Sequence, residues 1–556
     1  MSGRLANRRI RLLLAVFALV FGLTLLRAVW LQGIRAASLS AMAAKQHRET
    51  LTLPAKRGTI YDRTGIQLAL GESATTVYAD PLQIHDPTKV APVVARILRL
   101  KPAAVLAKLS DHSHGFVYLE RKADPAKAAR LAKRNITGLG FYAEERRFYP
   151  QHSIAAQVLG YAGVDNHGLS GLELALDKQL SGRTGHETIV RDPFGHVLDS
   201  VESKPAVDGT DVYLTIDHTI QAQAESVLRD TVRKWHAKDA TAVVLDPRTG
   251  DVLAMAVAPT YDANSFPTVP RDDQRNRAIT DTYEPGSTFK LVTVAGALST
   301  GIVTPSSPFT LKYEIQVADR KIHDAEPRGT ERMTVAQILA RSSNVGAITL
   351  AQLLGKTRLV QWISRFGFGH LTGIDYPGES PGIVLPPDKW SGSTIGNVPI
   401  GQGIAVTPIQ LASAYAAIAN GGVWIRPHVV ERVGGVPTAR PARRRIVRTW
   451  IAHQLTSMLQ NVVLDGTGTL AQIPGYHVAG KTGTAAKPDP QGGYSDSKYV
   501  ASFVGFVPAT RPRLVVLVAV DEPQGAIWGG AVAAPAFREI AEPTLQYLDV
   551  PPDARR

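Results

Sequence analysis

The chain contains no cysteine among its 556 residues. This absence excludes disulfide bonds, zinc sites built on thiolates and a cysteine nucleophile, so any covalent catalysis must use another side chain. Internal repeats and long low-complexity or disordered segments are missing as well. With 44% hydrophobic and 20% charged residues, the composition is that of a globular protein. The length predicts about two to four domains.

Acidic residues are the scarcer charge, because 48 Asp and Glu stand against 62 Lys and Arg and leave a formal net charge of +14. This excess favours an anionic neighbour, which could be nucleic acid, acidic lipid headgroups or an anionic polymer. The densest basic run, RPARRRIVR at residues 440–448, contains Pro441 and no aromatic residue that could stack on bases. We therefore interpret it as a solvated loop and expect no nucleic-acid partner.

One apolar run near the N-terminus decides the expected compartment. Residues 12–26 (LLLAVFALVFGLTLL) are uncharged, and residues 28–31 continue the run past Arg27, which gives about the ~20 residues that a bilayer requires. No acidic residue precedes it, but four arginines do: Arg4, Arg8, Arg9 and Arg11. The positive-inside rule then leaves the N-terminus in the cytoplasm and predicts export of the chain after about residue 32.

A cleaved signal peptide is the alternative interpretation of this run. Ala41-Met42-Ala43 has the small-x-small form of a cleavage site. It lies too far downstream of Leu26 for a signal peptide, so we favour an uncleaved anchor.

Two regimes follow the anchor. From about residue 50 to 210, short pieces rich in Gly, Pro and charge, with modest helices such as residues 125–134, indicate an irregular α+β module. Near Leu214, LTID and the helical pattern after it, with Asp217 as its expected N-cap, open a second regime. There, hairpins are predicted at residues 240–257 and 499–520, on either side of a mostly helical stretch from Ser287 to about Ala419. We therefore predict an α+β fold whose antiparallel sheet is built from distant segments and packs against a helical cluster.

The motif EPGSTFK, at residues 284–290, suggests a nucleophile. Pro285 and Gly286 break the preceding chain, and a helix that Gly301 stops is expected to follow, with Ser287 at or near its N-cap. Lys290 lies three residues on, shares the face of Ser287 and is within range to act as its base. The helix is apolar nearly all round, so this lysine should be buried with its pKa lowered toward neutrality. A capping serine followed by a chance lysine would give the same pattern.

Two further motifs are weak when taken alone. Ser342-Ser343-Asn344 lies on an expected turn between helices, where the first and third side chains can both project into a cleft, although helix capping explains such residues equally well. Lys481-Thr482-Gly483-Thr484 reads as an extended strand along which a ligand backbone can lie, with a cation and hydroxyls for a carboxylate. Residues 475–482 (GYHVAGKT) have the glycine spacing of a phosphate-binding loop, but no helix is expected to follow them, which disfavours that interpretation. In the order S-x-x-K, S-x-N and K-T-G, the three motifs are typical of penicillin-binding proteins and serine β-lactamases.

The chain resembles the class B penicillin-binding proteins, and within them the division-septum peptidoglycan D,D-transpeptidases of the penicillin-binding protein 3 type. The resemblance covers nearly the whole chain and includes RGTIYDRTG (residues 57–65), GLSGLELALDKQLSGRTG (168–185), LTIDHTIQ (214–221) and IGQGIAVTPIQLASAYAAIANGG (400–422). With the patterns above it predicts five segments: a cytoplasmic tail (1–11), a transmembrane anchor (12–31), a non-catalytic pedestal of the dimerisation type (32–213), a transpeptidase domain (214–550) and a short tail (551–556).

The resemblance also implies a reaction. Ser287 would attack the penultimate D-alanine carbonyl of a stem pentapeptide, and Lys290, as a hypothesis, would take the serine proton. Ser342 would relay a proton to the leaving amine with help from Lys481, and Asn344 would hold the donor amide. The substrate carboxylate would bind Thr482 and Thr484 beside Gly483, and the backbone N–H groups of Ser287 and Thr484 would form the oxyanion hole.

The implied partners are peptidoglycan stem peptides, β-lactams, the membrane through the N-terminal helix, and membrane proteins of the division machinery that include a glycosyltransferase. No metal or cofactor is required. The implied location is the bacterial inner membrane at the septum, with the catalytic domain in the periplasm.

Several alternatives stay open. An elongation-type class B enzyme would share the chemistry, but such chains usually carry insertions that are not seen here. A bifunctional class A enzyme would need a glycosyltransferase-like segment, a β-lactamase would not need the long module before residue 214, and a penicillin sensor would need an intracellular transmitter. The structural alternative is a divisome scaffold with incidental catalysis, which the three intact motifs disfavour.

Overall fold

The computed structural model describes residues 2–38, 48–191, 197–489 and 491–554. The chain divides into two compact units, of which the smaller comprises Met1–Lys56 with Gly182–Gly209 and the larger comprises Arg57–Ser181 with Thr210–Arg556. The smaller unit contains helix α1 (Ser2–Val29), its π-helical continuation η1 (Trp30–Ile34), and the sheet β1–β6–β7. Its strands are β1 (Arg48–Leu53), β6 (Gly185–Arg191) and β7 (Val197–Lys204).

The predicted anchor is helical. Within the described residues, Asn7–Ile34 is the one helical stretch that is long and apolar enough to cross a membrane, by length and composition. Its apolar side chains are exposed along the helix, as lipid-facing side chains would be. The alternative cleavage site at residues 41–43 lies outside the described residues.

The N-terminal part of the larger unit is built on one irregular sheet, with strand order β17-β16-β8-β2-β3-β4 and with β5 also paired to β3. The strands are β2 (Ile60–Tyr61), β3 (Gln67–Ala79), β4 (Val117–Ala123), β5 (Leu139–Phe148), β8 (Val212–Leu214), β16 (Val430–Val433) and β17 (Val436–Pro437). Short helices accompany them: η2 (Pro81–Gln83), α3 (Pro87–Leu98), α4 (Pro102–Leu109), α5 (Pro125–Ala132), α6 (Ala156–Leu159), α7 (Gly171–Ala175) and α8 (Asp177–Leu180). The irregular α+β module is thus confirmed, and strands from much later in the chain complete its sheet.

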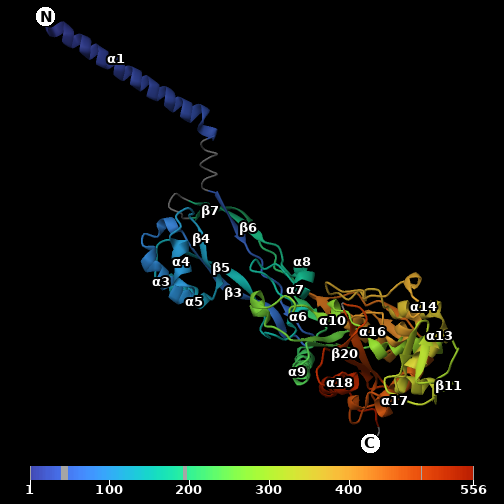
Figure 1. Ribbon diagram of the computed structural model, residues 1–556. Coiled ribbons are helices and arrows are strands. Elements are labelled where there is room, and N and C mark those ends of the chain that lie inside the picture. Colours follow the sequence, from blue (N-terminus) through green and yellow to red (C-terminus); the bar gives the residue numbers. More distant parts are fainter. Residues whose placement is uncertain (1, 39–47, 192–196, 490, 555–556) are drawn as a thin grey trace. The chain divides into compact units, whose positions relative to one another are not determined.

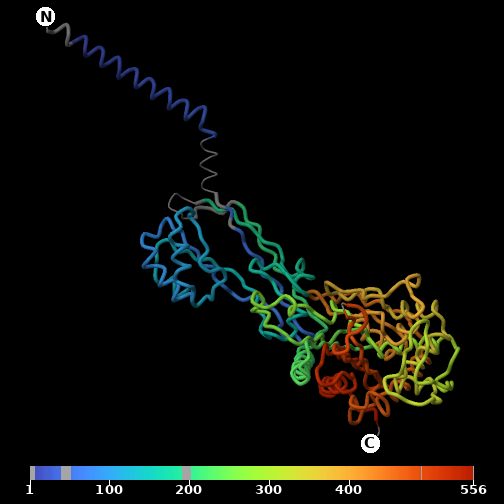
Figure 2. The backbone as a smooth tube through the Cα atoms, in the orientation of Figure 1, coloured from blue at the N-terminus to red at the C-terminus, as the bar shows by residue number. Residues whose placement is uncertain are grey.

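A five-stranded antiparallel sheet organises the rest, in the order β10-β9-β21-β20-β19. Its strands are β9 (Asp239–Leu245), β10 (Val252–Ala258), β19 (Ala479–Pro488), β20 (Tyr494–Val507) and β21 (Leu514–Asp521). Both predicted hairpins are present, and they join through β9 and β21, where Val243 lies opposite Leu517. Segments more than 250 residues apart therefore lie side by side, as the adjacent green and orange-red traces show (Figure 2). β19, which carries the K-T-G motif, is an edge strand.

Helices cover both faces of this sheet (Figure 1). On one face, α9 (His218–Trp235) and α18 (Gly529–Tyr547) pack on Val516 and Val518. On the other, α11 (Lys290–Ser299) and α16 (Pro408–Ala419) share a core with Val515 and Leu517. Because both faces are covered, β21 is buried along nearly its whole length and reads as a continuous apolar run rather than an alternating one. Asp217 caps α9 as expected, since its carboxylate accepts hydrogen bonds from the N–H groups of Thr219 and Ile220.

The stretch predicted to be mostly helical also contains strands. β11 (Pro308–Leu311) pairs with β14 (Glu331–Thr334), and β12 (Glu314–Val317) pairs with β13 (Arg320–His323). The sequence EIQV alternates polar and apolar residues, a period-two pattern that we overlooked. The helices and short turns in this part of the fold are η3 (Ala263–Thr268), α10 (Arg277–Thr280), η4 (Gly286–Phe289), α12 (Val335–Ala340), α13 (Asn344–Leu354), α14 (Lys356–Phe366), η5 (Pro387–Lys389), α15 (Thr394–Asn397), η6 (Val398–Ile400), α17 (Thr449–Asp465) and η7 (Thr469–Ala471).

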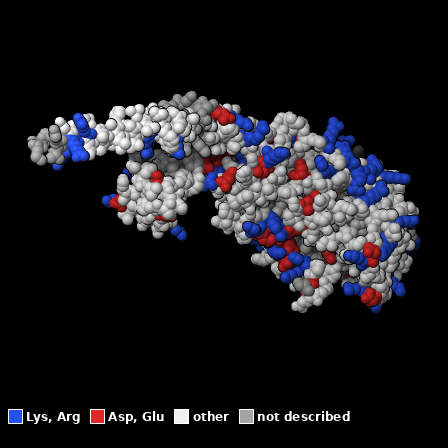
Figure 3. Space-filling view, turned by 90° about the horizontal axis from the view of Figure 1, so that it is seen from above, with Lys and Arg blue, Asp and Glu red and all other residues white. Residues whose placement is uncertain are grey.

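The basic run at residues 440–448 is not a simple loop. Its centre forms β18 (Arg443–Arg445), which pairs with β15 (Val423–Ile425). The three arginines are exposed, and the guanidinium of Arg444 lies 5.5 Å from the ring of Trp424, an aromatic partner supplied by another strand. In the view of Figure 3, Lys and Arg side chains are dense along the upper right of the larger unit, and a second group lies lower on this face among Asp and Glu. Backbone pairing with β15 accounts for the strand despite the like charges.

Glu225 provides a test of how α9 is held. It is 2% exposed, and its Oε1 accepts hydrogen bonds from Ala155 N and Gln221 Nε2, each at 2.8 Å. Burial raises the pKa of its carboxyl to about 7. The folded protein then binds a proton that the unfolded chain releases near its ordinary pKa of 4.5, so this group lowers stability as pH rises from about 4.5 to about 7.

We expect Glu225→Gln to raise the melting temperature of the full chain at pH 8, with the gain shrinking as the pH is lowered to 4.5. Glutamine keeps the acceptor for Ala155 N but cannot ionise. The matched control is Glu539→Gln on an exposed part of α18. It should change neither the melting temperature at pH 8 nor the melting temperature at pH 4.5. Equal effects of Glu225→Gln at pH 5 and pH 8 would contradict this account. Thermal unfolding at several pH values is the measurement.

Candidate active site

The turn before α11 presents Ser287. The structure places Ser287 inside the 3-10 turn η4, one turn ahead of α11, rather than at the N-cap of α11, which is Phe289. Pro285 (φ −69°) and Gly286 (φ +54°) start this tight turn, because the left-handed conformation of Gly286 is one that side chains disfavour. Ser287 is half-buried, and its hydroxyl makes no hydrogen bond within the described parts of the chain.

Hydrogen bonds with the segment at residues 400–422 hold this turn in place. Gly286 N donates to Gly401 O at 3.0 Å, and Tyr415 Oη donates to Thr288 O at 2.9 Å from the middle of α16. A Cβ at Gly401 would lie 2.1 Å from Gly286 O, so only glycine allows the approach. The nucleophile turn is thus held by one of the segments that carry the family resemblance.

Lys290 joins the first motif to the second. Its Nζ donates to Ser342 O at 2.6 Å, to Ser342 Oγ at 3.2 Å and to Asn344 Oδ1 at 2.7 Å. The expected burial of this lysine is observed, since its side chain is 0% exposed. Its amine is directed at the Ser342–Asn344 turn, and no bond to Ser287 is formed in this structure, so the predicted pairing of these two residues stays a prediction.

Burial also sets the charge state of the two lysines. Burial lowers the pKa of Lys290 to about 7, against the opposing effect of the negative charge of Asp324. Burial lowers the pKa of Lys481 well below its ordinary value, and the nearby Lys290 ammonium lowers it further. The site therefore holds two amines that exchange protons far more readily than exposed lysines do.

The Ser342–Asn344 turn connects α12 to α13. Ser342 has φ +58°, in the left-handed region that non-glycine residues rarely adopt. Ser343 caps α13 by accepting a hydrogen bond from Gly346 N at 3.0 Å, so the capping interpretation holds for the middle residue alone. The outer two side chains, Ser342 and Asn344, both contact Lys290.

Strand β19 supplies the third motif. Lys481 Nζ donates to Thr482 O and Thr482 Oγ1, both at 3.2 Å, and lies 3.5 Å from Thr467 Oγ1. The hydroxyls of Thr467 and Thr482 are 2.6 Å apart. Thr484 Oγ1 accepts a hydrogen bond from Gly529 N at the start of α18. The two threonines predicted to bind a carboxylate thus lie on the same side of β19, as the alternation of a strand requires.

The free edge of β19 faces the nucleophile turn. An ideal Cβ on Gly286 would lie 2.8 Å from Thr484 O, so this carbonyl points toward the turn. In a strand the N–H and C=O of one residue point to the same side, and the Thr484 N–H therefore faces the same edge. The two proposed oxyanion-hole donors, the N–H groups of Ser287 and Thr484, lie on adjacent elements.

Sequence reasoning missed three residues at this site. Asp324 accepts hydrogen bonds from the turn residue Ser343, and Thr467 adjoins Lys481 and Thr482. Burial raises the pKa of the Glu284 carboxyl, which accepts hydrogen bonds from Gly403 N and Tyr494 Oη. Glu284 also lines a cavity of about 200 Å³. Glu284 adjoins the first motif and could have been found by its position. Asp324 and Thr467 carry no sequence signal, because tertiary folding alone brings them to the site.

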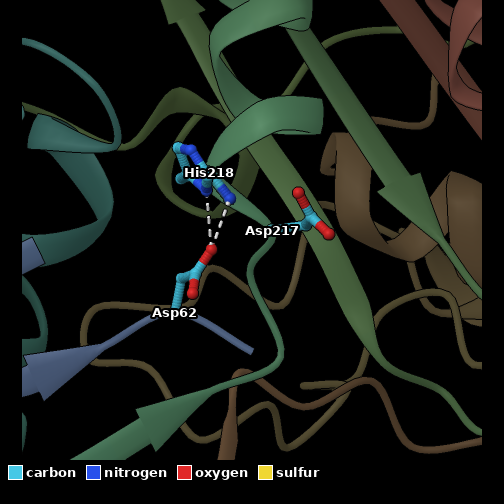
Figure 4. Close-up of side chains that lie close together, drawn as sticks. All are labelled: Asp62, Asp217 and His218. Carbon is cyan, nitrogen blue, oxygen red and sulfur yellow. Dashed lines mark hydrogen bonds and ion pairs between the residues drawn. The ribbon is translucent and has the colours of Figure 1, made fainter. Parts of the chain in front are cut away.

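A second polar cluster lies outside this site, where RGTIYDRTG meets LTIDHTIQ. Asp62, Asp217 and His218 place their side-chain oxygen and nitrogen atoms within 4.8 Å of one another. Figure 4 shows His218 bonded to Asp62 while the Asp217 carboxylate stands apart. The Asp62 carboxylate also accepts hydrogen bonds from the N–H groups of Thr64 and Ile66. The Asp217 carboxylate caps the N-terminus of α9. Hydrogen bonds within the chain account for these groups, and we assign no metal to them.

Comparison with known proteins agrees with this geometry. The family model of the penicillin-binding protein transpeptidase domain matches residues 240–542, and that of the penicillin-binding protein dimerisation domain matches residues 52–214. Peptidoglycan D,D-transpeptidase FtsI of Escherichia coli is 34% identical over 98% of this chain and 93% of its own length. Stage V sporulation protein D of Bacillus subtilis is 33% identical over 99% and 88%. The structure of penicillin-binding protein 3 from Mycobacterium tuberculosis in complex with aztreonam has a TM-score of 0.72 at 32% identity, covering 91% of this chain and 98% of that one.

The chain belongs to the class B penicillin-binding proteins. It is an enzyme of the peptidoglycan D,D-transpeptidase type, and peptidoglycan as substrate and β-lactams as ligands are consistent with this family.

Gly483 tests whether β19 must approach the nucleophile turn closely. A Cβ there would lie 2.4 Å from Ser502 Oγ and 2.8 Å from Pro285 O. Gly483→Ala must therefore move β19 away from the turn, and we expect covalent labelling by a fluorescent penicillin to slow by about 100-fold. Gly435→Ala, where nothing lies within 4 Å of the added carbon, is the matched control. Wild-type labelling rates in Gly483→Ala would contradict the required approach.

Proposed function

We propose that this chain cross-links peptidoglycan stem peptides through an acyl-enzyme on Ser287. Ser287 Oγ attacks the carbonyl carbon of the penultimate D-alanine, and the bond to the terminal D-alanine breaks. An amine of a second stem peptide then attacks the ester, forms the cross-link and restores the Ser287 hydroxyl. The hydroxyl of the half-buried Ser287 makes no hydrogen bond within the described residues and is available for this attack.

Lys290 and Ser342 handle the protons in this proposal. A neutral Lys290 accepts the Ser287 proton, for which a pKa of about 7 is well suited near neutral pH. Ser342 Oγ, 3.2 Å from Lys290 Nζ, passes a proton to the leaving amine, with Lys481 nearby as a further cation. Asn344 binds an amide of the donor peptide. Its Oδ1 accepts a hydrogen bond from Lys290 Nζ and so orients that amine.

Binding of the donor uses the edge of β19. The peptide lies against this edge strand beside Gly483, and its terminal carboxylate is bound near Thr482 and Thr484. The N–H groups of Ser287 and Thr484 stabilise the oxyanion as it forms. β-Lactams acylate Ser287 by the same route. No step assigns a role to a metal or a cofactor.

One observation carries this proposal: a fully buried lysine with a pKa of about 7 bridges Ser342 and Asn344, three residues after a serine on an adjacent turn. A helix-capping serine with a chance lysine would not produce this arrangement. The lysine would then be solvated.

Covalent labelling tests the nucleophile. We expect a fluorescent penicillin to label the full-length wild-type chain, with a rate that rises as pH increases through about 7, because only neutral Lys290 accepts a proton. Ser287→Ala should abolish the label, and Lys290→Ala should slow labelling by about 10² to 10⁴-fold. Ser299→Ala, at the last residue of α11, is the control. A label retained in folded Ser287→Ala protein would overturn the assignment of the nucleophile.

The cellular role proposed is cross-linking at the division septum. The similarity to FtsI of Escherichia coli supports it. We propose that residues 12–31 anchor the chain with its N-terminus in the cytoplasm and its catalytic domain outside, beside membrane proteins of the division machinery that include a glycosyltransferase. The domain limits given above, 32–213 and 214–550, are part of this proposal.

Depletion in the cell of origin separates the remaining roles. A septal enzyme predicts filamentous cells after depletion, whereas rounded cells would point to side-wall elongation. Re-expression of Ser287→Ala at normal levels should fail to restore division if catalysis is the essential role. Full restoration by this variant would favour a scaffold with incidental catalysis.

A further inference from the structure

Asp324 is a buried carboxylate beside the active site that belongs to none of the three motifs. It follows β13 directly and is 5% exposed. Its oxygens accept hydrogen bonds from Ser343 Oγ at 3.0 and 3.1 Å and from Val345 N at 3.0 Å. They also accept from Arg328, through Nε at 2.9 Å and through a terminal guanidinium nitrogen at 2.6 Å.

These hydrogen bonds connect Asp324 to the Ser342–Asn344 turn and hold the turn in place. Ser343 lies between the two residues that contact Lys290, and Val345 N belongs to the first turn of α13. The residue before Asp324 contributes as well, because His323 O accepts a hydrogen bond from Asn344 Nδ2 at 3.0 Å. Ser342 keeps an unfavourable φ of +58°, so a firm support is needed to maintain this turn.

Asp324 also acts on Lys290 through its charge. Burial disfavours the Lys290 ammonium, and the negative charge of Asp324 favours it. The other groups around Lys290 are the neutral Ser342 and Asn344, and Lys481 from β19, whose own pKa is lowered by Lys290. Arg328 forms an ion pair with Asp324 at 2.6 Å and partly offsets its charge.

We propose that Asp324 is a positioning residue that holds the Ser342–Asn344 turn in place and stabilises the positive charge that Lys290 gains when it takes the Ser287 proton. This inference rests on the proposed function, in which Lys290 is the base that takes the Ser287 proton. The reaction places a cation in a site from which water is largely excluded, and a fixed carboxylate lowers the free energy of that cation without reorganisation.

Two substitutions should shift the pH dependence of penicillin acylation in opposite directions. Asp324→Asn removes the negative charge in a side chain of the same shape, so the ascending limb near pH 7 should move to lower pH by roughly one unit. Its limiting rate at high pH should fall by about 10- to 100-fold. Arg328→Gln leaves the Asp324 charge without its counter-ion, so the same limb should move to higher pH. Either variant alone tests the sign if the other fails to fold.

Ser343→Ala is the matched control for the mechanical role. It removes the hydroxyl that ties the turn to Asp324 but changes no charge. We expect its limiting rate to fall while the midpoint of the pH profile stays at the wild-type value. All measurements use the full-length chain, with the melting temperature recorded for each variant.

The outcomes separate this inference from the function on which it rests. Opposite shifts in Asp324→Asn and Arg328→Gln, with none in Ser343→Ala, support it. Unchanged midpoints in both charge variants, with wild type still labelled at Ser287, would overturn the inference and leave the proposed function standing. Wild-type labelling that does not depend on Ser287 would overturn both.

Discussion

The active site depends on the burial of the Lys290 side chain, whose amine lies inside the protein. A buried amine is costly unless it is hydrogen-bonded, and three acceptors on the Ser342–Asn344 turn satisfy Lys290. The apolar helix α11 is buried from Lys290 to Leu298, which places the Lys290 side chain inside the protein. The turn in which Ser342 has a φ of +58° and Ser343 caps α13 brings those acceptors to one nitrogen.

The fold meets this requirement by joining distant segments around one helix. α11 packs between the helical cluster and the central sheet, whose strands come from residues 239–258 and 479–521. β19 carries the third motif and is the edge strand of the sheet. One of its edges pairs with β20, and the other edge remains open. Glycines at 286, 401 and 483 permit backbones to approach within distances that a Cβ would block. Close backbone approaches therefore bring the third motif to the nucleophile turn, and the hydrogen bonds of Lys290 to Ser342 and Asn344 join the first motif to the second.

Much of this could be predicted from sequence, and the failures have physical causes. β-Rich segments on either side of a turn correctly indicated both hairpins of the sheet, and the uniformly apolar sequence after Lys290 correctly indicated that this lysine is buried. Ser287, expected at or near the N-cap of the helix, lies two residues before the N-cap Phe289, because Pro285 and Gly286 start a 3-10 turn before α11. The strands between residues 308 and 334 were missed because they are short and largely exposed. Asp324 could not be found at all, since its role arises only when a strand end meets a helix N-terminus.

The two buried lysines indicate what the site is built to bind. Lys290 and Lys481 are each 0% exposed, and each lies close enough for the charge of Lys290 to lower the pKa of Lys481. Desolvation and mutual repulsion both oppose the charged forms of this pair, although the negative charge of Asp324 favours the Lys290 ammonium. A ligand that brings a carboxylate and develops an oxyanion would relieve both effects at once. Negative charge that develops during the reaction would interact favourably with these amines, and interactions that are strongest in the transition state accelerate a reaction.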